Sequence, residues 1–352
     1  MNFLSLEVLL QVGLGLVLLV LIVADCALFT NAIEWLGKRL NLSDGAVGSV
    51  LAAVGTALPE TLVPLVALAA GVFNPDLGRQ MGQDIGVGAI LGAPFMLATL
   101  AMGLSGLTFL VARARNKRTA STMTIDAPWL RRDLKYFFVA YALLIIGHFI
   151  PMLSARYALA SMLILLYCAY VVRTLQKAQT DTDLAEEAHD TIGPLWFMPK
   201  NKSPQMLAIC LQLGISLLIL IALAHAFVDV IHTTAHLLDI PALMLSLLII
   251  PIATELPEKF NSVMWIWQGK DQLALGNLSG AMVFQSCLPG VIGLLLTPWH
   301  LEALAWGCVV ACLASAATIA LFARGGRATP YVLLSGVGFY GAYLWFALSG
   351  AR

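Results

Sequence analysis

Apolar runs long enough to cross a lipid bilayer follow one another along almost the whole sequence. A membrane-spanning helix needs about 20 predominantly apolar residues. Hydrophobic residues make up 60% of the 352 residues and charged residues only 11%, too few to cover a water-soluble protein of this size. The runs are continuous rather than alternating, which favours helices over membrane strands. We therefore expect an all-α integral membrane protein with ten transmembrane helices, at about residues 8–28, 46–70, 84–111, 136–154, 157–174, 205–228, 241–265, 272–297, 301–323 and 330–349.

The basic residues predict how such a protein is oriented. If ten helices alternate in direction, all the Lys and Arg residues except Arg79, Arg156 and Arg352 fall on one side of the membrane, Lys259 among them. Loops rich in Lys and Arg stay in the cytoplasm. Both termini are therefore expected on the non-cytoplasmic side of a plasma (inner) membrane. The 20 basic and 20 acidic residues cancel, so nothing in the charge favours a nucleic-acid partner.

A hydrophilic interval divides the chain near its midpoint. Residues 174–203 form the longest such stretch and are interpreted as a cytoplasmic linker. It separates a first half, residues 1–173, from a second half, residues 204–352. Each half then holds five predicted helices. Because five is odd, the second half enters the membrane from the opposite face, and the two halves are predicted to be inverted repeats.

Two short motifs occur once in each half. Residues 55–60 read GTALPE and residues 253–258 read ATELPE; residues 88–93 read GAILGA and residues 276–281 read GNLSGA. Inverted repeats in transporters place the substrate site near the midplane, on helices interrupted by proline or glycine. The motifs therefore predict two facing repeats, at about 46–104 and 241–297.

The first motif places acidic residues inside apolar runs. Glu60, Glu255 and Glu258 each carry a charge that costs about 2.5–3.5 kcal/mol at the centre of a spanning helix. Pro59 and Pro257 remove a helical hydrogen bond at the same places, which predicts carbonyl oxygens available to a cation. The alternative is that these glutamates lie near the membrane surface or cap helices, which leaves the repetition unexplained.

The motifs resemble the α-repeats of the cation/Ca²⁺ exchanger superfamily, the sodium/calcium antiporters. Their pattern reads G-T-S-x-P-E, then G-N-x-x-G-S-N. The resemblance extends over nearly the whole chain, which resembles a divergent member of the superfamily. It implies that Glu60 and Glu258 are the central cation-coordinating carboxylates, with Thr56 and Thr254 as oxygen ligands. It also implies close helix packing at four small positions, which are Gly88, Gly92, Gly276 and Gly280.

The sequence departs from that pattern at several ligand positions. Ala57 replaces a serine and Ala89 an asparagine, whereas Asn277 is kept and Glu255 stands where serine is usual. Ca²⁺ takes six to eight oxygen ligands. The oxygen ligands that remain in this sequence suffice for one divalent ion but are too few for several separate Na⁺ sites. Two neighbouring acids, Glu255 and Glu258, favour coupling to protons over sodium. The candidate ligands are Glu60, Glu258, Glu255, Thr56, Thr254, Asn277 and Gln285.

The predicted function is a secondary active cation antiporter that exchanges Ca²⁺, or another cation, against H⁺ or Na⁺ by alternating access. The sequence holds neither a P-loop nor a dinucleotide-binding motif, so an ion gradient is expected to supply the energy. No cofactor is expected besides the transported cation. The lost ligands leave an alternative, an exchanger-fold protein that no longer transports and acts as a sensor or assembly subunit. An intramembrane enzyme is a more remote choice, because the H-E-x-x-H motif is absent.

Other polar residues in or beside the apolar runs have less specific interpretations. Asp25 and Asp229 fit either an access path or a place near the membrane surface, and Asp84 marks the start of a span. His232 and His236 share a helix face at i and i+4 and could bind a metal, but the sequence offers no obvious third ligand.

Overall fold

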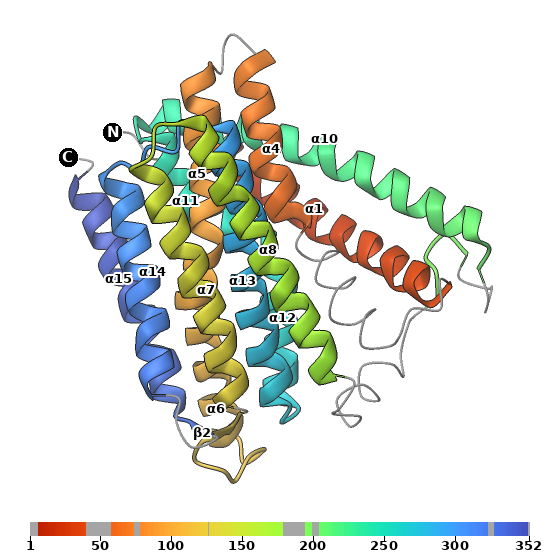
Figure 1. The fold of residues 1–352 in the computed structure, drawn as a ribbon. Coiled ribbons are helices and arrows are strands. Elements are labelled where there is room, and N and C mark those ends of the chain that lie inside the picture. The colour runs from red at the N-terminus through yellow and green to blue at the C-terminus, as the bar shows by residue number, and fades with distance from the viewer. Residues whose placement is uncertain are drawn as a thin grey trace.

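The computed structural model describes residues 6–39, 58–73, 78–125, 127–178, 194–198, 204–322 and 327–350. Nearly all regular structure in these segments is helical. Figure 1 shows most helices side by side in one bundle, with α1 and α10 leaning away from it as a pair. By length and composition, seven helical stretches of the described chain could cross a membrane. The all-helical membrane architecture is therefore confirmed, and the count of ten spans stays a prediction.

The two longest helices pack along each other. Both α1 (Leu6–Arg39) and α10 (Met206–Leu238) continue well past the predicted apolar runs. Polar side chains are buried where they meet: the Ser216 hydroxyl donates to the Asp25 carboxylate at 3.0 Å, and the Gln212 amide donates to the Leu28 carbonyl at 2.9 Å. These bonds satisfy polar groups that would otherwise be costly to bury.

The third predicted span is one continuous helical rod that changes its winding. It consists of α5 (Arg79–Met96), a π-helical turn η2 (Leu97–Ala101) and α6 (Met102–Ala114). Pro94 has no N–H to donate inside α5, and the Thr99 hydroxyl donates to the Phe95 carbonyl at 2.5 Å. Both features disturb the regular ladder, as is common at π-bulges.

The predicted span 241–265 is two helices, α11 (Ala242–Thr254) and α12 (Leu256–Trp267), which meet at Glu255. The corresponding predicted span of the first half, 46–70, is described only from residue 58, where α4 (Leu58–Phe73) begins. The next helix, α13 (Asp271–Leu296), lies against α4, α5 and α12. Four further helices complete the bundle: α7 (Ala127–His148), α8 (Leu153–Ala178), α14 (Ala303–Phe322) and α15 (Pro330–Gly350).

Helix α7 begins earlier than predicted. Its first turns hold Arg131, Arg132, Asp133 and Lys135, which leaves only residues 136–148 as an apolar stretch. Charged residues inside the first turns explain why sequence reasoning placed the start of this helix too late. The structure separates α7 from α8 at residues 149–152, earlier than the predicted boundary between residues 154 and 157.

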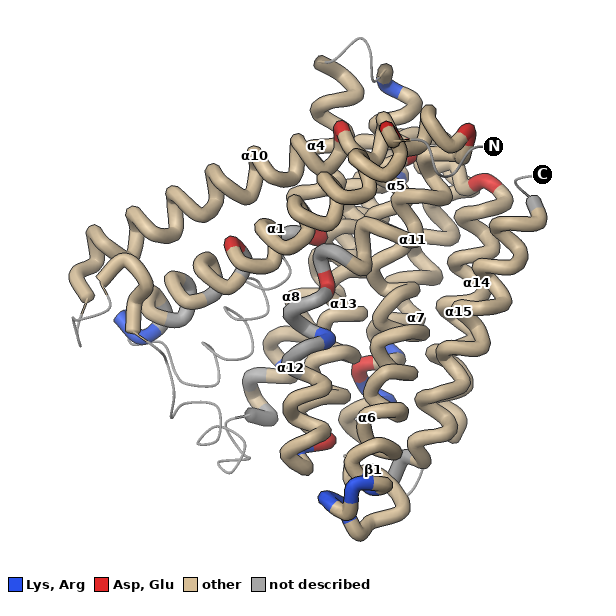
Figure 2. Tube along the Cα trace, turned by 180° about the vertical axis from the view of Figure 1, so that it is seen from behind, with Lys and Arg blue, Asp and Glu red and all other residues tan. Residues whose placement is uncertain are grey.

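A short antiparallel ladder closes one end of the bundle. It joins β1 (Met123–Thr124) to β2 (Arg327–Ala328), and next to it the Arg118 guanidinium forms an ion pair with Asp271. Basic positions gather around β1 (Figure 2). In Figure 1, α1 begins and α15 ends at the opposite end of the bundle. The end that carries β1 is therefore the more basic end.

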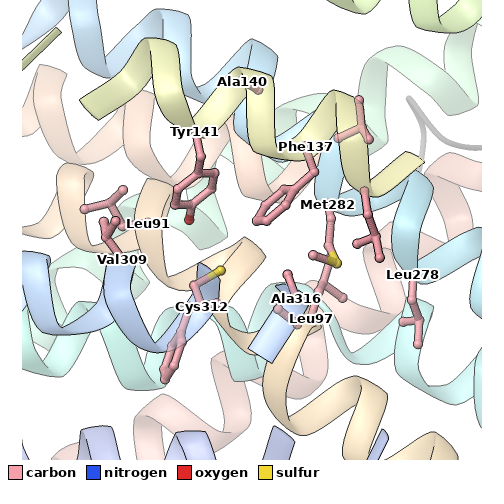
Figure 3. Close-up of a cluster of buried hydrophobic side chains, with 14 of the residues drawn as sticks. Leu91, Leu97, Phe137, Ala140, Tyr141, Leu278, Met282, Val309, Cys312 and Ala316 are labelled. Atoms are coloured by element: carbon pink, nitrogen blue, oxygen red, sulfur yellow. The ribbon is translucent and has the colours of Figure 1, made fainter. Parts of the chain in front are cut away.

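The hydrophobic core has two main parts. The larger part fills the bundle between α5, α7, α13 and α14, where Tyr141, Phe137 and Met282 point toward one another (Figure 3). The second part lies where α1, α4, α5, α10 and α11 meet. Since α5 contributes to both, it connects the bundle to the α1–α10 pair.

Glycines in α5 let α11 approach closely. A Cβ built on Gly92 would lie 2.5 Å from the Leu247 carbonyl oxygen, and one on Gly88 would overlap the Ser246 side chain. Among the described residues, nothing lies within 4 Å of such a Cβ on Gly276, and Gly280 meets the Tyr170 hydroxyl at 3.2 Å. The expectation of close packing is therefore met in the first half, and for Gly276 and Gly280 it stays a prediction. The segment that would face α13 in the equivalent way precedes residue 58 and lies outside the described residues.

We expect Gly92→Ala to lower the free energy of unfolding by about 1–3 kcal/mol, because the added methyl group overlaps the α11 backbone. Thermal unfolding of the purified protein in detergent would measure the change. The control is Gly341→Ala on α15, where nothing lies within 4 Å of the added carbon and the midpoint should not fall. Equal midpoints for the two variants would contradict the packing argument.

Candidate functional site

The helix break in the second repeat places a glutamate inside the protein. Glu255 has φ −96° and ψ 9°, so it interrupts the helix at a single residue, and its side chain is 0% exposed. Its backbone N–H donates to the Pro251 carbonyl at 3.2 Å, which closes α11. Pro257 follows at the start of α12, where the missing N–H is tolerated. The predicted proline-linked break is thus present.

The first half also places a motif glutamate at the start of a helix, although Glu60 aligns with Glu258 in the repeated motif and Glu255 aligns with Ala57. Glu60 is in the first turn of α4, and its side chain is only 3% exposed. An acidic side chain in the first turn is stabilised by the helix dipole. The two described glutamates of the repeated motif are therefore both buried at helix N-termini, and neither lies on a solvated surface.

A lysine that sequence reasoning assigned to a cytoplasmic loop lies at the same break. The Lys259 ammonium is 3.2 Å from the Pro251 carbonyl oxygen and 3.9 Å from Oε2 of Glu255, and its side chain is 11% exposed. The placement in a loop was wrong. Two signals in the sequence indicate its position: it falls inside the predicted span 241–265, and it follows Glu255 at i+4, the spacing of helical ion pairs.

Helix α13 carries the two predicted amide ligands at different levels. The Asn277 amide donates to the Ser262 hydroxyl of α12 at 3.4 Å. Gln285 lies eight residues further, about 12 Å along a regular helix, and is 1% exposed. Neither its amide nitrogen nor its oxygen has a hydrogen-bond partner among the described residues. Buried amides of this kind call for an explanation, because leaving them unsatisfied is unfavourable.

The structure describes the side chains of Glu60, Glu255, Asn277 and Gln285 from the predicted set. Thr56 lies outside the described residues, as do the side chains of Thr254 and Glu258, whose backbones belong to α11 and α12. Since α13 lies against both α4 and α12, the elements that carry the four described residues adjoin one another. Within the described part of the chain, no three His, Cys, Asp or Glu side chains are close enough to hold a metal ion by themselves.

Two buried polar residues were not predicted. Asp133 of α7 is 0% exposed and accepts a hydrogen bond of 2.7 Å from the Ser279 hydroxyl of α13. It also pairs with Arg132 at 2.9 Å. Ser279 belongs to the second repeated motif, so a polar residue of that motif bonds α7. The sequence signal is the run of charges next to residue 136, which was attributed to a loop.

The remaining polar candidates are dispersed. Asp25 is buried between α1 and α10, where it accepts a hydrogen bond from Ser216. Asp229 is half-exposed near His225, at 3.9 Å, and the Asp84 carbonyl accepts a hydrogen bond from Ser246 at 3.3 Å. The rings of His232 and His236 lie 4.8 Å apart with no third metal ligand among the described side chains.

Comparison with known proteins gives one consistent picture. Residues 10–176 and 209–349 match the sequence profile of the sodium/calcium exchanger protein family. The inner membrane protein YrbG of Escherichia coli (strain K12) is 28% identical over 308 residues, which cover 85% of this chain and 82% of YrbG.

Solved structures share the fold. The H⁺/Ca²⁺ exchanger CAX superimposes with a TM-score of 0.72 at 14% identity, over 96% of this chain and 87% of its own. The sodium-calcium exchanger NCX_Mj superimposes with a TM-score of 0.58 at 19% identity, over 96% and 98%. At these identities the likeness concerns the fold alone.

We expect Gln285→Leu to leave the free energy of unfolding unchanged or to raise it, because it removes a buried amide that has no hydrogen-bond partner among the described residues. The matched control is Gln212→Leu. That amide is also buried, but it donates to Leu28 and Asn31 and accepts from the Phe197 N–H. Its loss should destabilise the protein by about 1–3 kcal/mol. Thermal unfolding in detergent distinguishes the two; a large loss for Gln285→Leu would show that its amide is satisfied.

Proposed function

Because the chain belongs to the sodium/calcium exchanger protein family, we propose that it is a secondary active cation antiporter. The observation that carries the proposal is the burial of Glu60 and Glu255 at the starts of α4 and α12. Both helices lie against α13. Carboxylates buried in a membrane bundle are costly unless a cation or a proton neutralises them. A transported cation supplies that neutralisation.

The cation site we propose is formed by the repeated motifs. Glu60, Glu255 and Glu258 supply charge, and the amide oxygen of Gln285 supplies a neutral ligand. Hard cations such as Ca²⁺ prefer such a mixture of carboxylate, carbonyl and hydroxyl oxygens. The other members of the proposed ligand set are Thr56, Thr254 and Asn277.

The coupling ion we propose is H⁺ rather than Na⁺. Helix α5 presents Gly88, Ala89, Gly92 and Ala93 in its buried part, so this segment offers few oxygen ligands for additional sodium sites. Carboxylates that release the cation can take up protons instead, and neighbouring acids in a low dielectric do so readily. Exchange would then follow from competition of Ca²⁺ and H⁺ for the same carboxylates.

Alternating access requires two halves that can exchange roles. The helix contacts support this arrangement, because most of them have a counterpart after the halves are exchanged. Helix α4 lies against α5 as α12 lies against α13, and α15 lies against α6 as α8 lies against α13. We therefore propose ten spans in two inverted repeats, 1–173 and 204–352, joined by a cytoplasmic linker at 174–203.

The proposed orientation has both termini on the non-cytoplasmic side of the inner membrane. The basic positions around β1 and the opposite placement of the start of α1 and the end of α15 support it (Figures 1 and 2).

A second function deserves a direct test, because Lys259 already places a positive charge at Glu255. If that ammonium and the missing oxygen ligands prevent transport, the protein is a cation sensor or assembly subunit. Such a protein would bind Ca²⁺ without moving it across the membrane.

Uptake of radioactive Ca²⁺ into proteoliposomes with an imposed pH gradient tests the antiporter proposal. We expect Glu60→Gln and Glu258→Gln each to reduce the initial rate about 10- to 100-fold, because each removes a charged ligand. Glu302→Gln, at an exposed glutamate, is the control and should transport normally. Equal uptake by all four proteins would exclude transport at these carboxylates. If a Na⁺ gradient at clamped pH drove Ca²⁺ uptake, the coupling ion would be Na⁺ and the proposal of H⁺ coupling would be wrong.

A further inference from the structure

The Lys259 ammonium lies where a small cation would lie. Its neighbours are the Pro251 carbonyl oxygen of α11 at 3.2 Å and the carboxylate of Glu255, the residue at the α11–α12 break, at 3.9 Å. A carbonyl at a broken helix and a carboxylate are the oxygen types that bind alkali and alkaline-earth cations in membrane transporters. The side chains are 11% and 0% exposed, so little water competes for the contact.

Lysine is suited to take the place of a monovalent ion. Its ammonium is a compact unit charge with three donors, carried on a flexible stem. An ordinary helical ion pair at i and i+4 lies on a regular exposed face and contributes little. Here Glu255 and Lys259 stand at the first turn of α12, where the Lys259 N–H donates to the Glu255 carbonyl at 3.1 Å. The ammonium reaches back across the break to Pro251 in α11, eight residues earlier. The contact therefore belongs to the break, next to the glutamates that we propose as cation ligands.

Lys259 also changes the net charge of the proposed ligand cluster, by which we mean the three glutamates of the proposed site. Glu60, Glu255 and Glu258 together carry a charge of −3 when ionised, and Lys259 reduces it to −2, which one divalent cation neutralises. We propose that Lys259 is a tethered cation: its ammonium occupies a monovalent-cation position between Pro251 and Glu255, excludes soluble Na⁺ from it, and sets the charge of the site for a single divalent ion. The inference rests on the proposed function and specifies how the same site selects its ions.

The first experiment asks whether removal of the ammonium opens the position to Na⁺. The full-length Lys259→Met variant is heated in detergent in NaCl or in choline chloride of the same ionic strength. We expect its unfolding midpoint to rise with Na⁺ concentration, because a ligand that binds only the folded state stabilises it. Wild type and the control Lys135→Met, at an exposed lysine of α7, should show no preference for Na⁺ over choline.

A second comparison does not depend on that variant folding with an uncompensated Glu255. Glu255→Gln alone leaves a cluster charge of −1 with Lys259 in place, and we expect it to bind Ca²⁺ about tenfold more weakly, because charge count tunes affinity. The double variant Glu255→Gln/Lys259→Met returns the cluster to −2. It should recover most of the lost Ca²⁺ affinity while showing no Na⁺ effect. A lysine with a purely structural role would give no such recovery.

Two results would overturn the proposal. One is a folded Lys259→Met protein whose midpoint is the same in NaCl and choline chloride. The other is a double variant that binds Ca²⁺ no more tightly than Glu255→Gln. Transport failure is distinguishable from both, because wild type would then take up no Ca²⁺ in proteoliposomes even if Lys259→Met gained its response to Na⁺.

Discussion

Lipid offers no hydrogen bonds, so each charged group inside this bundle needs a partner within the protein. Several described residues meet this requirement in pairs that join different helices or the two sides of a helix break. Ser279 of α13 donates to Asp133 of α7, Ser216 of α10 donates to Asp25 of α1, and Lys259 of α12 donates to the Pro251 carbonyl of α11 across the break. Polar contacts thus determine which helices are neighbours, and apolar packing then fills the space between them.

The arrangement separates rigid packing from ion chemistry. Glycines of α5 bring its backbone against α11, whereas the carboxylates lie at the starts of α4 and α12. The α1–α10 pair contacts the rest mainly through the second, smaller core. A transporter of the proposed kind needs such a division, because the ligand-bearing helix ends must keep their geometry while larger bodies shift around them.

The sequence predicts the helices well because apolar runs and lipid thickness leave few alternatives, and it locates the break at Glu255 through Pro257. It misplaces charges next to apolar runs. Lys259 and Asp133 look like loop residues when each charged residue is considered singly. Only a partner that is distant in sequence or adjacent in the folded structure makes the burial of such a charge favourable. A list of candidate ligands also overlooks the separation of Asn277 and Gln285 along the axis of α13, because it counts oxygen atoms without their positions along the helix.

The π-helical turn at Leu97–Ala101 affects which neighbours the long third rod can have. One additional residue in the turn rotates everything beyond it by about 100° relative to a regular helix. Gly88 and Gly92 before the turn face α11, while Gly103 and Gly106 after it face Val337 and Pro330 of α15. A single continuous helix can therefore offer a smooth glycine face to two different partners. Removing one residue from the turn would aim the second pair of glycines away from α15.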